Sequence, residues 1–455
     1  MDRERGYLFL ESTTTLCSIC EKRIPGKIIE KEGKIFVLKH CFTHGEHEEL
    51  LEEDSNYYKT RNEYTKPGTK SLIQTKIVRG CPYDCGLCNS HDQHTCIGLI
   101  EVTNDCDLNC PVCYANSGKK NYLDLKILEK MMDFYQTSEN NSAEVLQISG
   151  GEPTMHKDIL KIIKMALEKK FKYVMLNTNG LRISQDKEFV NELAKFKSGF
   201  EIYLQFDGFD DIATKKLRGK NIIEMKLKAM TNLIEHKIPI TIVSTIERGV
   251  NDKEIGKIVE FSLNKPGIRG INFQPVAYFG RINEINTKNR ITITGIISEI
   301  EKQTNGLLKK SDFFPLPCDV DRVSVNYMYR DKNRVVPLTR KFDPKKYLGI
   351  INNTFNFNAD ELKEKLKSCS GSCCNYFNFL SELKFLIPKG LDKKSESERK
   401  EYYNNNTFRI SITSFVDRYN FDMKSIQKEC VHILTPDLKK IPFSTYNMIY
   451  RKMER

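Results

Sequence analysis

Three cysteines in the segment 102–118, VTNDCDLNCPVCYANSG, have a spacing that suits metal chemistry. Cys106, Cys110 and Cys113 follow the pattern C-x3-C-x2-C, and Tyr114 comes directly after them. Three thiolates can hold three irons of a 4Fe-4S cluster, which leaves the fourth iron without a protein ligand. Catalytic metal sites keep a coordination position open in the same way. The triplet therefore predicts a reactive iron–sulfur cluster.

A second run of cysteines, CPYDCGLCNSHDQHTC, lies just upstream. It places four thiols within sixteen residues, at Cys81, Cys85, Cys88 and Cys96. Four thiolates are enough to close a 4Fe-4S or zinc site. His91 and His94 lie in the same run and can replace a thiolate or hydrogen-bond to one. We expect these four cysteines to bind an auxiliary 4Fe-4S cluster.

The N-terminal segment contains the two short motifs CSIC and CFTH, separated by an expected hairpin in KIIEKEGKIFVLKH. Paired motifs of this kind are typical of a rubredoxin or zinc ribbon. The expected ligands are Cys17, Cys20, Cys41 and His44. Tetrahedral thiolate sites suit both zinc and mononuclear iron, so either metal fits. We expect a structural role for this site.

The C-terminal third contains five more cysteines: Cys318, Cys369, Cys373, Cys374 and Cys430. Four of them can close a second auxiliary 4Fe-4S cluster, although their spacing does not say which four. Buried free cysteines without a metal are the alternative. In an intracellular chain, cysteines are in either case more often metal ligands or catalytic groups than disulfides.

Between the cysteine-rich segments, short β-branched runs alternate with amphipathic stretches. The expected strands lie at 96–103, 143–149, 172–178, 200–206, 238–246 and 270–275. The expected helices lie at 123–135, 157–170, 187–196, 222–237 and 254–263. This alternation predicts an α/β fold with parallel strands and right-handed crossovers. A partial (β/α)6 TIM barrel and an open doubly wound sheet both fit it.

In either architecture, ligands bind at the carboxyl ends of the strands. The residues that follow the expected strands are unusual for plain turns. After the cysteine triplet come the strand-end residues Gly150, Gly151, Glu152, Pro153, Asn179, Gln205, Asp207 and Thr245. We expect them to surround one site.

The bulk composition places the chain among soluble or peripheral multidomain proteins. Its 455 residues contain 39% hydrophobic residues and no long apolar run, and the N-terminus lacks the features of a secretion signal. Lys and Arg exceed Asp and Glu by 72 − 60 = 12, which suits anionic partners, but no nucleic-acid motif is visible. We predict a cytoplasmic protein divided into a metal domain at 1–78, a cluster segment at 79–96, a core at 97–300 and a C-terminal domain at 301–455.

The triplet CDLNCPVCY, followed by GGEP at the next strand end, resembles the radical S-adenosylmethionine (SAM) superfamily. The resemblance implies a 4Fe-4S cluster on Cys106, Cys110 and Cys113, whose unique iron binds SAM. It also implies reductive cleavage of SAM to a 5'-deoxyadenosyl radical that abstracts hydrogen from an unactivated carbon. Cofactors carry the hard chemistry in such enzymes, and the protein supplies binding and orientation.

The resemblance assigns further roles around SAM. Gly150, Gly151, Glu152 and Pro153 are expected to hold its amino group, and Tyr114 to pack beside the cluster. Asn179, Gln205 and Asp207 are candidates for the ribose hydroxyls or the substrate, and Thr245 for the adenine. A loss of turnover, leaving an iron–sulfur electron carrier or regulator, is the non-enzymatic alternative.

The whole chain resembles an archaeal subgroup through the runs CPYDCGLC, SDFFPLPC and DRYNFD. That subgroup includes tetraether lipid synthases, which join isoprenoid chain ends, and methyltransferases of a pterin precursor. We expect carbon–carbon coupling of lipid chains, with pterin methylation as the alternative. The implied partners are a lipid or small-molecule substrate, an electron donor such as ferredoxin or flavodoxin, and the inner face of the membrane, with no nucleic acid.

Overall fold

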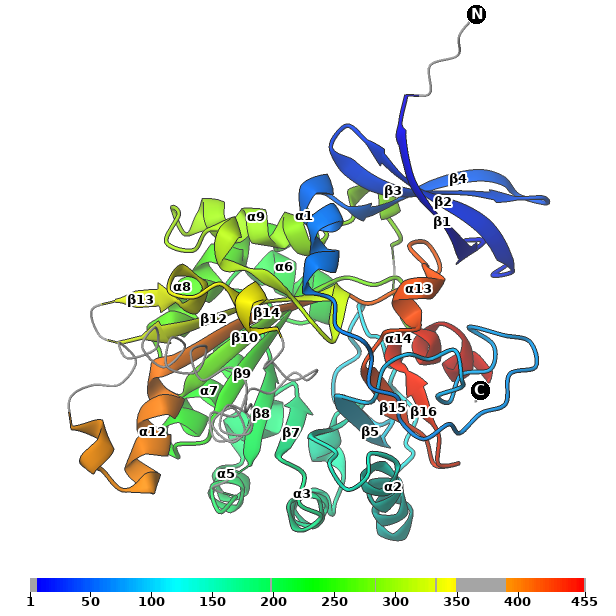
Figure 1. Ribbon diagram of the computed structural model, residues 1–455. Helices are drawn as coiled ribbons and strands as arrows, with labels where there is room; N and C mark the ends of the chain where they lie inside the picture. The colour runs from blue at the N-terminus through cyan, green and yellow to red at the C-terminus, as the bar shows by residue number, and fades with distance from the viewer. Residues whose placement is uncertain (1–5, 197–198, 283, 332–333, 349–389, 454–455) are drawn as a thin grey trace, which may run out of the picture.

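The structure is a computed structural model that describes residues 6–196, 199–282, 284–331, 334–348 and 390–453. Cys369, Cys373 and Cys374 lie outside these described residues. The described chain forms a small N-terminal sheet beside a large α/β body (Figure 1).

The N-terminal sheet has four antiparallel strands in the order of the chain. They are β1 (Leu8–Leu16), β2 (Arg23–Lys31), β3 (Lys34–Cys41) and β4 (Gly45–Glu52). The expected hairpin corresponds to β2 and β3, which pair from Gly26 and Lys39 to the turn at Lys31 and Lys34. Ile28, Ile35 and Val37 form the small apolar core of this sheet.

Six parallel strands form the centre of the large sheet. They are β5 (Ile97–Thr103), β6 (Val145–Gly150), β7 (Tyr173–Thr178), β8 (Phe200–Gln205), β9 (Ile240–Ile246) and β10 (Ile268–Pro275). They lie side by side in the order of the chain, which confirms the expected partial barrel of six βα units. Their carboxyl ends therefore meet along one edge.

Helices cover the outer face of these strands (Figure 1). The helices of the core are α2 (Leu125–Ser138), α3 (Ile159–Glu168), α4 (Leu181–Gln185), α5 (Lys187–Leu193), α6 (Asp211–Arg218), α7 (Ile223–Glu235), α8 (Ile255–Leu263) and α9 (Ile293–Gln303). The apolar stripe of α3, with Ile159, Ile162, Ile163 and Ala166, is buried in the main core. The i, i+3, i+4 spacing of such stripes is what made the helices predictable.

The C-terminal third extends the central sheet at both edges. Its strands are β11 (Phe314–Leu316), β12 (Asp319–Arg330), β13 (Val335–Pro337), β14 (Thr407–Thr413), β15 (Val431–Leu434) and β16 (Lys440–Pro442). β14 runs parallel to β10, and β15 runs parallel to β5. The expected C-terminal domain therefore shares the sheet of the core, while the boundaries drawn at residues 78, 96 and 300 stay predictions.

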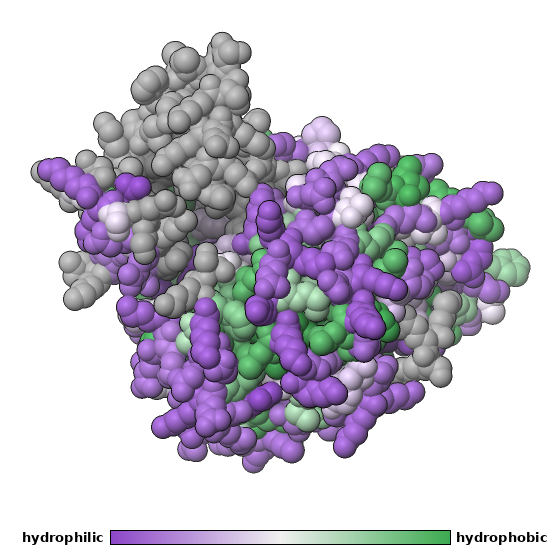
Figure 2. Space-filling model, turned by 90° about the horizontal axis from the view of Figure 1, so that it is seen from below, coloured by the Kyte–Doolittle hydropathy of each residue, from purple (hydrophilic) through white to green (hydrophobic). Residues whose placement is uncertain are grey.

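Short helices complete the described chain: α1 (Ser55–Thr60), α12 (Glu396–Asn406), α13 (Met423–Ile426), α14 (Phe443–Thr445) and α15 (Arg451–Met453). A π-helical turn, Tyr446–Tyr450, joins the last two. Among the described residues, no helix has the length and apolarity needed to span a membrane. On the face seen in Figure 2, hydrophilic residues surround smaller apolar areas.

Candidate functional site

The cysteine triplet lies in the long loop after β5, at the carboxyl edge of the sheet. The loop after β10 holds it in place through Arg281. The backbones of Cys113 and Arg281 exchange two hydrogen bonds of 2.9 Å, and the Arg281 Nε donates to the Cys110 carbonyl at 2.7 Å. The loop after β5, the first central strand, is thus held to the loop after β10, the last one. Arg281 was not among the residues predicted from the sequence.

The GGEP loop after β6 lies directly against the cysteine loop. The Gly151 amide donates to the Thr103 carbonyl, and the Glu152 amide donates to the Asp105 carbonyl, both at 2.7 Å. A Cβ atom on Gly150 or Gly151 would lie 2.2 Å from one of these same carbonyl oxygens. The two glycines are therefore required for the close approach of the loops. Pro153 begins a short 3-10 helix, where its missing amide proton is not needed.

Glu152 is buried and joins the loops after β6 and β7. Its carboxylate accepts hydrogen bonds from the Thr154 amide and hydroxyl, the Thr178 hydroxyl and the Asn179 amide, at 2.6–3.1 Å. Burial raises the pKa of this carboxyl, and these hydrogen bonds oppose the rise. The contacts that the structure shows for Glu152 are thus with the chain itself. Its contact with the SAM amino group stays a prediction.

Replacing Glu152 with glutamine should destabilise the fold by about 1–3 kcal/mol, because an amide donor would face the Asn179 amide or a threonine hydroxyl. We expect a lower midpoint of denaturant unfolding and weaker SAM binding, measured by calorimetry. Glu168→Gln is the matched control, since Glu168 lies in an exposed pair with Lys164. Equal unfolding midpoints for the two variants would contradict the positioning role of Glu152.

The predicted residues of the next strand ends do meet in one network. Asp207 accepts two hydrogen bonds from the Arg218 guanidinium, at 2.7 and 2.8 Å, and one from the Thr245 amide at 2.9 Å. Arg218 also donates to the Thr245 hydroxyl at 2.9 Å. Gln205 donates to the Asp207 carboxylate from its side-chain amide. Arg218 lies at the end of α6 and is buried with Asp207.

Lys226 is the second buried cation of this network. Its ammonium donates to the Gln205 side-chain oxygen at 2.6 Å and to the Asn179 carbonyl. The Asn179 side chain in turn donates to Asp107 of the cysteine loop at 2.6 Å. Burial lowers the pKa of Lys226 to about 8. A lysine within the apolar stripe of α7, beside Ile223 and Ala229, is a signal that sequence reading could have used.

Both cations lie near the cysteine thiols. Burial raises the pKa of Cys106 to about 12, and it raises that of Cys110, where Arg218 and Lys226 oppose the rise. Metal binding must displace the protons of such thiols. Three thiols on one loop beside two buried cations fit an anionic cluster with thiolate ligands, so the residues present suit the 4Fe-4S group.

The C-terminal helices close the β5 side of this site. Arg451 of α15 forms an ion pair with Glu101 of β5, and its guanidinium lies 6.0 Å from the Tyr114 ring. The Tyr114 hydroxyl hydrogen-bonds to Ser149 at 2.8 Å. The Tyr114 ring packs against Phe443 with a centroid distance of 5.1 Å. Tyr114 thus lies between the radical loop and the C-terminal segment.

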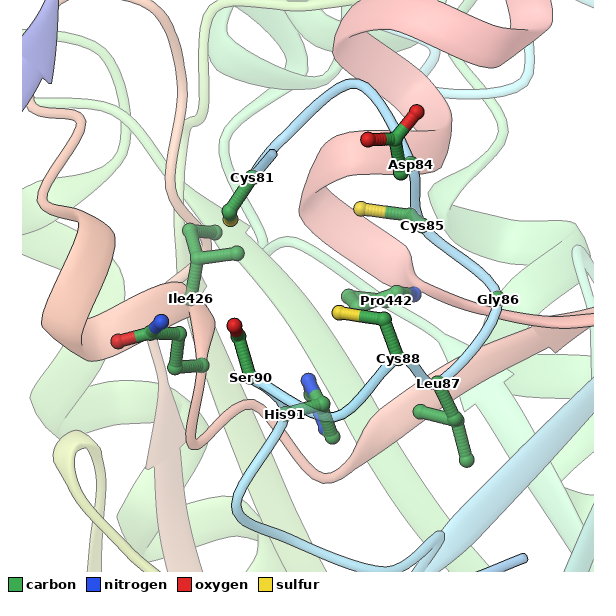
Figure 3. A pocket seen from close by; sticks show the side chains of 11 residues that line it. Cys81, Asp84, Cys85, Gly86, Leu87, Cys88, Ser90, His91, Ile426 and Pro442 are labelled. Carbon is green, nitrogen blue, oxygen red and sulfur yellow. The ribbon is translucent and has the colours of Figure 1, made fainter. Parts of the chain in front are cut away.

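A second cysteine site packs against the same apolar cluster as Tyr114 and Phe443. Cys81, Cys85 and Cys88 line a small pocket, together with His91, Ile426 and Pro442 among others. In Figure 3 the sulfur atoms of Cys85 and Cys88 point into this pocket. The Tyr450 hydroxyl accepts a hydrogen bond from the Cys85 amide at 2.6 Å. We keep these three cysteines as the candidate ligands of an auxiliary 4Fe-4S cluster.

Cys96 does not belong to this pocket, which corrects the grouping predicted from the sequence. Its Sγ lies with those of Cys318 and Cys430, all within 4.8 Å of one another. The reason is the pairing of β5 with β15, in which the Cys96 amide donates to the Cys430 carbonyl at 2.9 Å. Of the five C-terminal cysteines, Cys318 and Cys430 are thus placed together by the structure.

The expected N-terminal ligands do come together. The ligand atoms of Cys17, Cys20, Cys41 and His44 all lie within 4.8 Å of one another. The Sγ atoms of Cys20 and Cys41 are 4.0 Å apart, and the His44 Nδ1 lies 3.4 Å from the Sγ atoms of Cys17 and Cys41. Four convergent ligands of this type suit one tetrahedral metal ion.

Two family models match the chain. The model of the radical SAM superfamily matches residues 100–262, and that of the HMPTM N-terminal zinc ribbon domain matches residues 9–53. Among solved structures, Streptococcus suis SuiB bound to S-adenosylmethionine is similar, with a TM-score of 0.36 and 22% identity over 42% of this chain and 44% of that one.

Curated relatives are similar over longer stretches. A 7,8-dihydro-6-hydroxymethylpterin dimethyltransferase of Methanocaldococcus jannaschii is 34% identical over 97% of this chain and 94% of its own. A GTP 3',8-cyclase of Aquifex aeolicus is 22% identical over 53% of this chain and 74% of its own. With the thiol triplet, the close GGEP loop and these matches, the chain belongs to the radical SAM superfamily, as an enzyme that depends on a 4Fe-4S cluster and SAM.

Proposed function

We propose that the chain is a radical SAM methyltransferase that acts on a reduced pterin carrying a hydroxymethyl group. The observation that carries this proposal is the end-to-end relative, whose name gives a dihydropterin as its substrate. The relatives reported above favour this function over the coupling of lipid chains, which was the first expectation from the sequence. Contact with a membrane likewise has no support from them.

The residues around the triplet would have different roles in binding the cluster and SAM. When bound, the cluster and SAM supply a radical strong enough to remove hydrogen from an unactivated carbon. Cys106, Cys110 and Cys113 would hold the cluster, and the Gly150–Gly151 turn would leave room for SAM beside it. Lys226 and Arg218 would bring positive charge to the anionic cluster.

Aromatic side chains near Tyr114 would suit a flat heterocycle. Phe443 packs against Phe415 and Phe279 with centroid distances of 4.3 and 6.0 Å. Tyr114 and Phe415 are both half-buried. A bicyclic ring gains stacking energy against such faces, while neighbouring polar groups can orient it by hydrogen bonds.

The test uses full-length protein reconstituted under anaerobic conditions with iron, sulfide, SAM and a low-potential reductant. With 7,8-dihydro-6-hydroxymethylpterin we expect 5'-deoxyadenosine and a pterin heavier by one or two CH2 units, detected by mass spectrometry. SAM with an isotope-labelled methyl group, and separately labelled one-carbon donors, would identify the methyl source. A reduced ferredoxin or flavodoxin should replace the chemical reductant.

A parallel reaction with archaeal diether phospholipid distinguishes the two functions. Each coupling of two chain ends removes two hydrogen atoms, so the product would have the summed mass of the joined lipids less two hydrogens for each new bond, or the mass of one lipid less two hydrogens if both chains belong to it. Coupled lipid without a methylated pterin would overturn the proposal. Cleavage of SAM with neither product would leave the chain a radical SAM enzyme and reject the pterin as its substrate.

A further inference from the structure

The third group of thiols, Cys96, Cys318 and Cys430, lies far from the radical loop along the sheet. Cys96 and Cys430 stand just before β5 and β15, and Cys318 stands between β11 and β12. All three are buried, among Phe314, Leu316 and other apolar side chains. Because β5 has seven residues at about 3.3 Å each, this group and the triplet lie at opposite ends of that strand.

We propose that Cys96, Cys318, Cys430 and His94 bind a single zinc ion, in a closed structural site distinct from the iron–sulfur clusters. The sulfur distances support one shared ion. A tetrahedral zinc with Zn–S bonds of about 2.3 Å keeps its sulfurs about 3.8 Å apart. The Sγ atoms of Cys318 and Cys430 are 3.9 Å apart, close to the 4.0 Å between Cys20 and Cys41 of the zinc ribbon.

A 4Fe-4S cluster fits these three thiols less well than a single ion. Each thiolate of a 4Fe-4S cluster binds a different iron, so its cysteine sulfurs stand farther apart than ligands of one ion. In the described part of the chain, only the ribbon ligands and Cys96, Cys318 and Cys430 bring three or more metal-binding atoms within 4.8 Å of one another. The thiols of the triplet Cys106–Cys113 and those of the Cys81–Cys88 pocket do not all lie within this distance of one another.

We take His94 as the fourth ligand; its ring would turn toward Cys318 and Cys430 on binding, because it lies outside the 4.8 Å group that the three thiols form. Its Nε2 lies 3.7 Å from the Cys96 Sγ, and its Nδ1 lies 3.0 Å from the side-chain oxygen of Gln93. The side-chain amide of Gln93 donates to the Cys318 carbonyl at 3.0 Å, which fixes which end of Gln93 faces His94. The Nδ1 of His94 is therefore the protonated nitrogen, and the lone pair of Nε2 faces the Cys96 thiol. Metal-binding histidines are oriented in this way.

The proposed zinc site joins distant parts of the chain. The three cysteines come from parts of the chain more than 100 residues apart. An ion on them would hold β15 and the β11–β12 hairpin to the amino end of β5, the end of a barrel where residues serve stability.

The experiment counts metals in full-length protein that carries its clusters. In the ribbon variant Cys41→Ser, we expect about one zinc per chain to remain, because the second site is intact. Adding His94→Ala should remove that zinc and leave the iron content unchanged. Absence of zinc from the Cys41→Ser protein would overturn the proposal. So would a fall in iron on adding His94→Ala, which would show that the group holds a cluster.

A second measurement needs no further variant. X-ray absorption at the zinc edge of the Cys41→Ser protein should show about three sulfur neighbours and one nitrogen. A first shell of oxygen and nitrogen alone would show adventitious zinc and reject the site. Cleavage of SAM by the His94→Ala protein serves as the folding control, since the radical loop lies at the other end of β5. The metal content and the zinc-edge spectrum do not depend on whether the substrate is a pterin.

Discussion

Replacement of Cys110 by alanine should reduce the formation of 5'-deoxyadenosine to the background rate. Cys110 lies in the middle of the triplet, and its backbone carbonyl is held by Arg281. Without this thiolate one iron loses its protein ligand. Loss of a residue that only hydrogen-bonds to a metal ligand already reduces activity about 10–100-fold, so the loss of a ligand should cost more. We therefore expect a loss of more than about 100-fold, measured by chromatography after anaerobic reconstitution.

The control for this variant is Cys20→Ala in the zinc ribbon. It removes one thiol from a closed metal site of the same chain but leaves the radical loop unchanged. We expect Cys20→Ala to lose zinc and to keep SAM cleavage when folded, and Cys110→Ala to show the opposite pattern. If both variants cleaved SAM equally well, the triplet would not be the site where the reaction starts.

The strands and helices of the core were predictable because their signals are local. Each of β5–β10 is a short, mostly buried run rich in apolar residues, and each long helix of the core carries an apolar stripe. The triplet and GGEP both follow such runs, so their meeting at one edge follows from parallel strand order alone. The helices α4 and α6 were missed because they are short and lie inside loops, and the longer α9 was not predicted either.

The grouping of the buried cysteines was not predictable because it depends on long-range strand pairing. Cys96 is eight residues from Cys88 in the chain, but it shares its metal-binding space with Cys318 and Cys430. That arrangement arises only when β15 adds to the edge of the sheet beside β5. Spacing in the sequence can propose a set of ligands, but it cannot choose between neighbours brought together by the fold.

The partners of the charged residues around the triplet were also not predictable from the sequence. Asp207 was predicted as a cofactor ligand from its place at a strand end, but in the structure its carboxylate binds Arg218 and the Thr245 amide. An acidic residue at such an edge can thus position a cation, and the contact of Asp207 with the ribose or the substrate stays a prediction. The Lys226 ammonium likewise holds the Gln205 side chain and the Asn179 carbonyl by hydrogen bonds. Some of the predicted strand-end residues therefore hold the other side chains of the site in place.

Replacement of Arg218 by methionine should destabilise the protein by about 3–5 kcal/mol, because it leaves the carboxylate of Asp207 buried and unpaired. The midpoint of denaturant unfolding would measure this loss. Arg334→Met is the matched control, since Arg334 pairs with Asp331 at the exposed surface and should change stability by less than about 1 kcal/mol. Equal losses for the two variants would contradict the importance of the buried pair.

The double variant Arg218→Met, Asp207→Asn separates stability from chemistry. Asparagine removes the unpaired charge and still accepts a hydrogen bond from the Thr245 amide, while its NH2 group faces the Gln205 amide, so part of the lost stability should return. SAM cleavage should stay low, because the double variant lacks the positive charge that favours the Cys110 thiolate and the hydrogen bond from Arg218 to the Val112 carbonyl. Iron content after reconstitution should fall with activity. Full recovery of both stability and cleavage would show that Arg218 only neutralises Asp207.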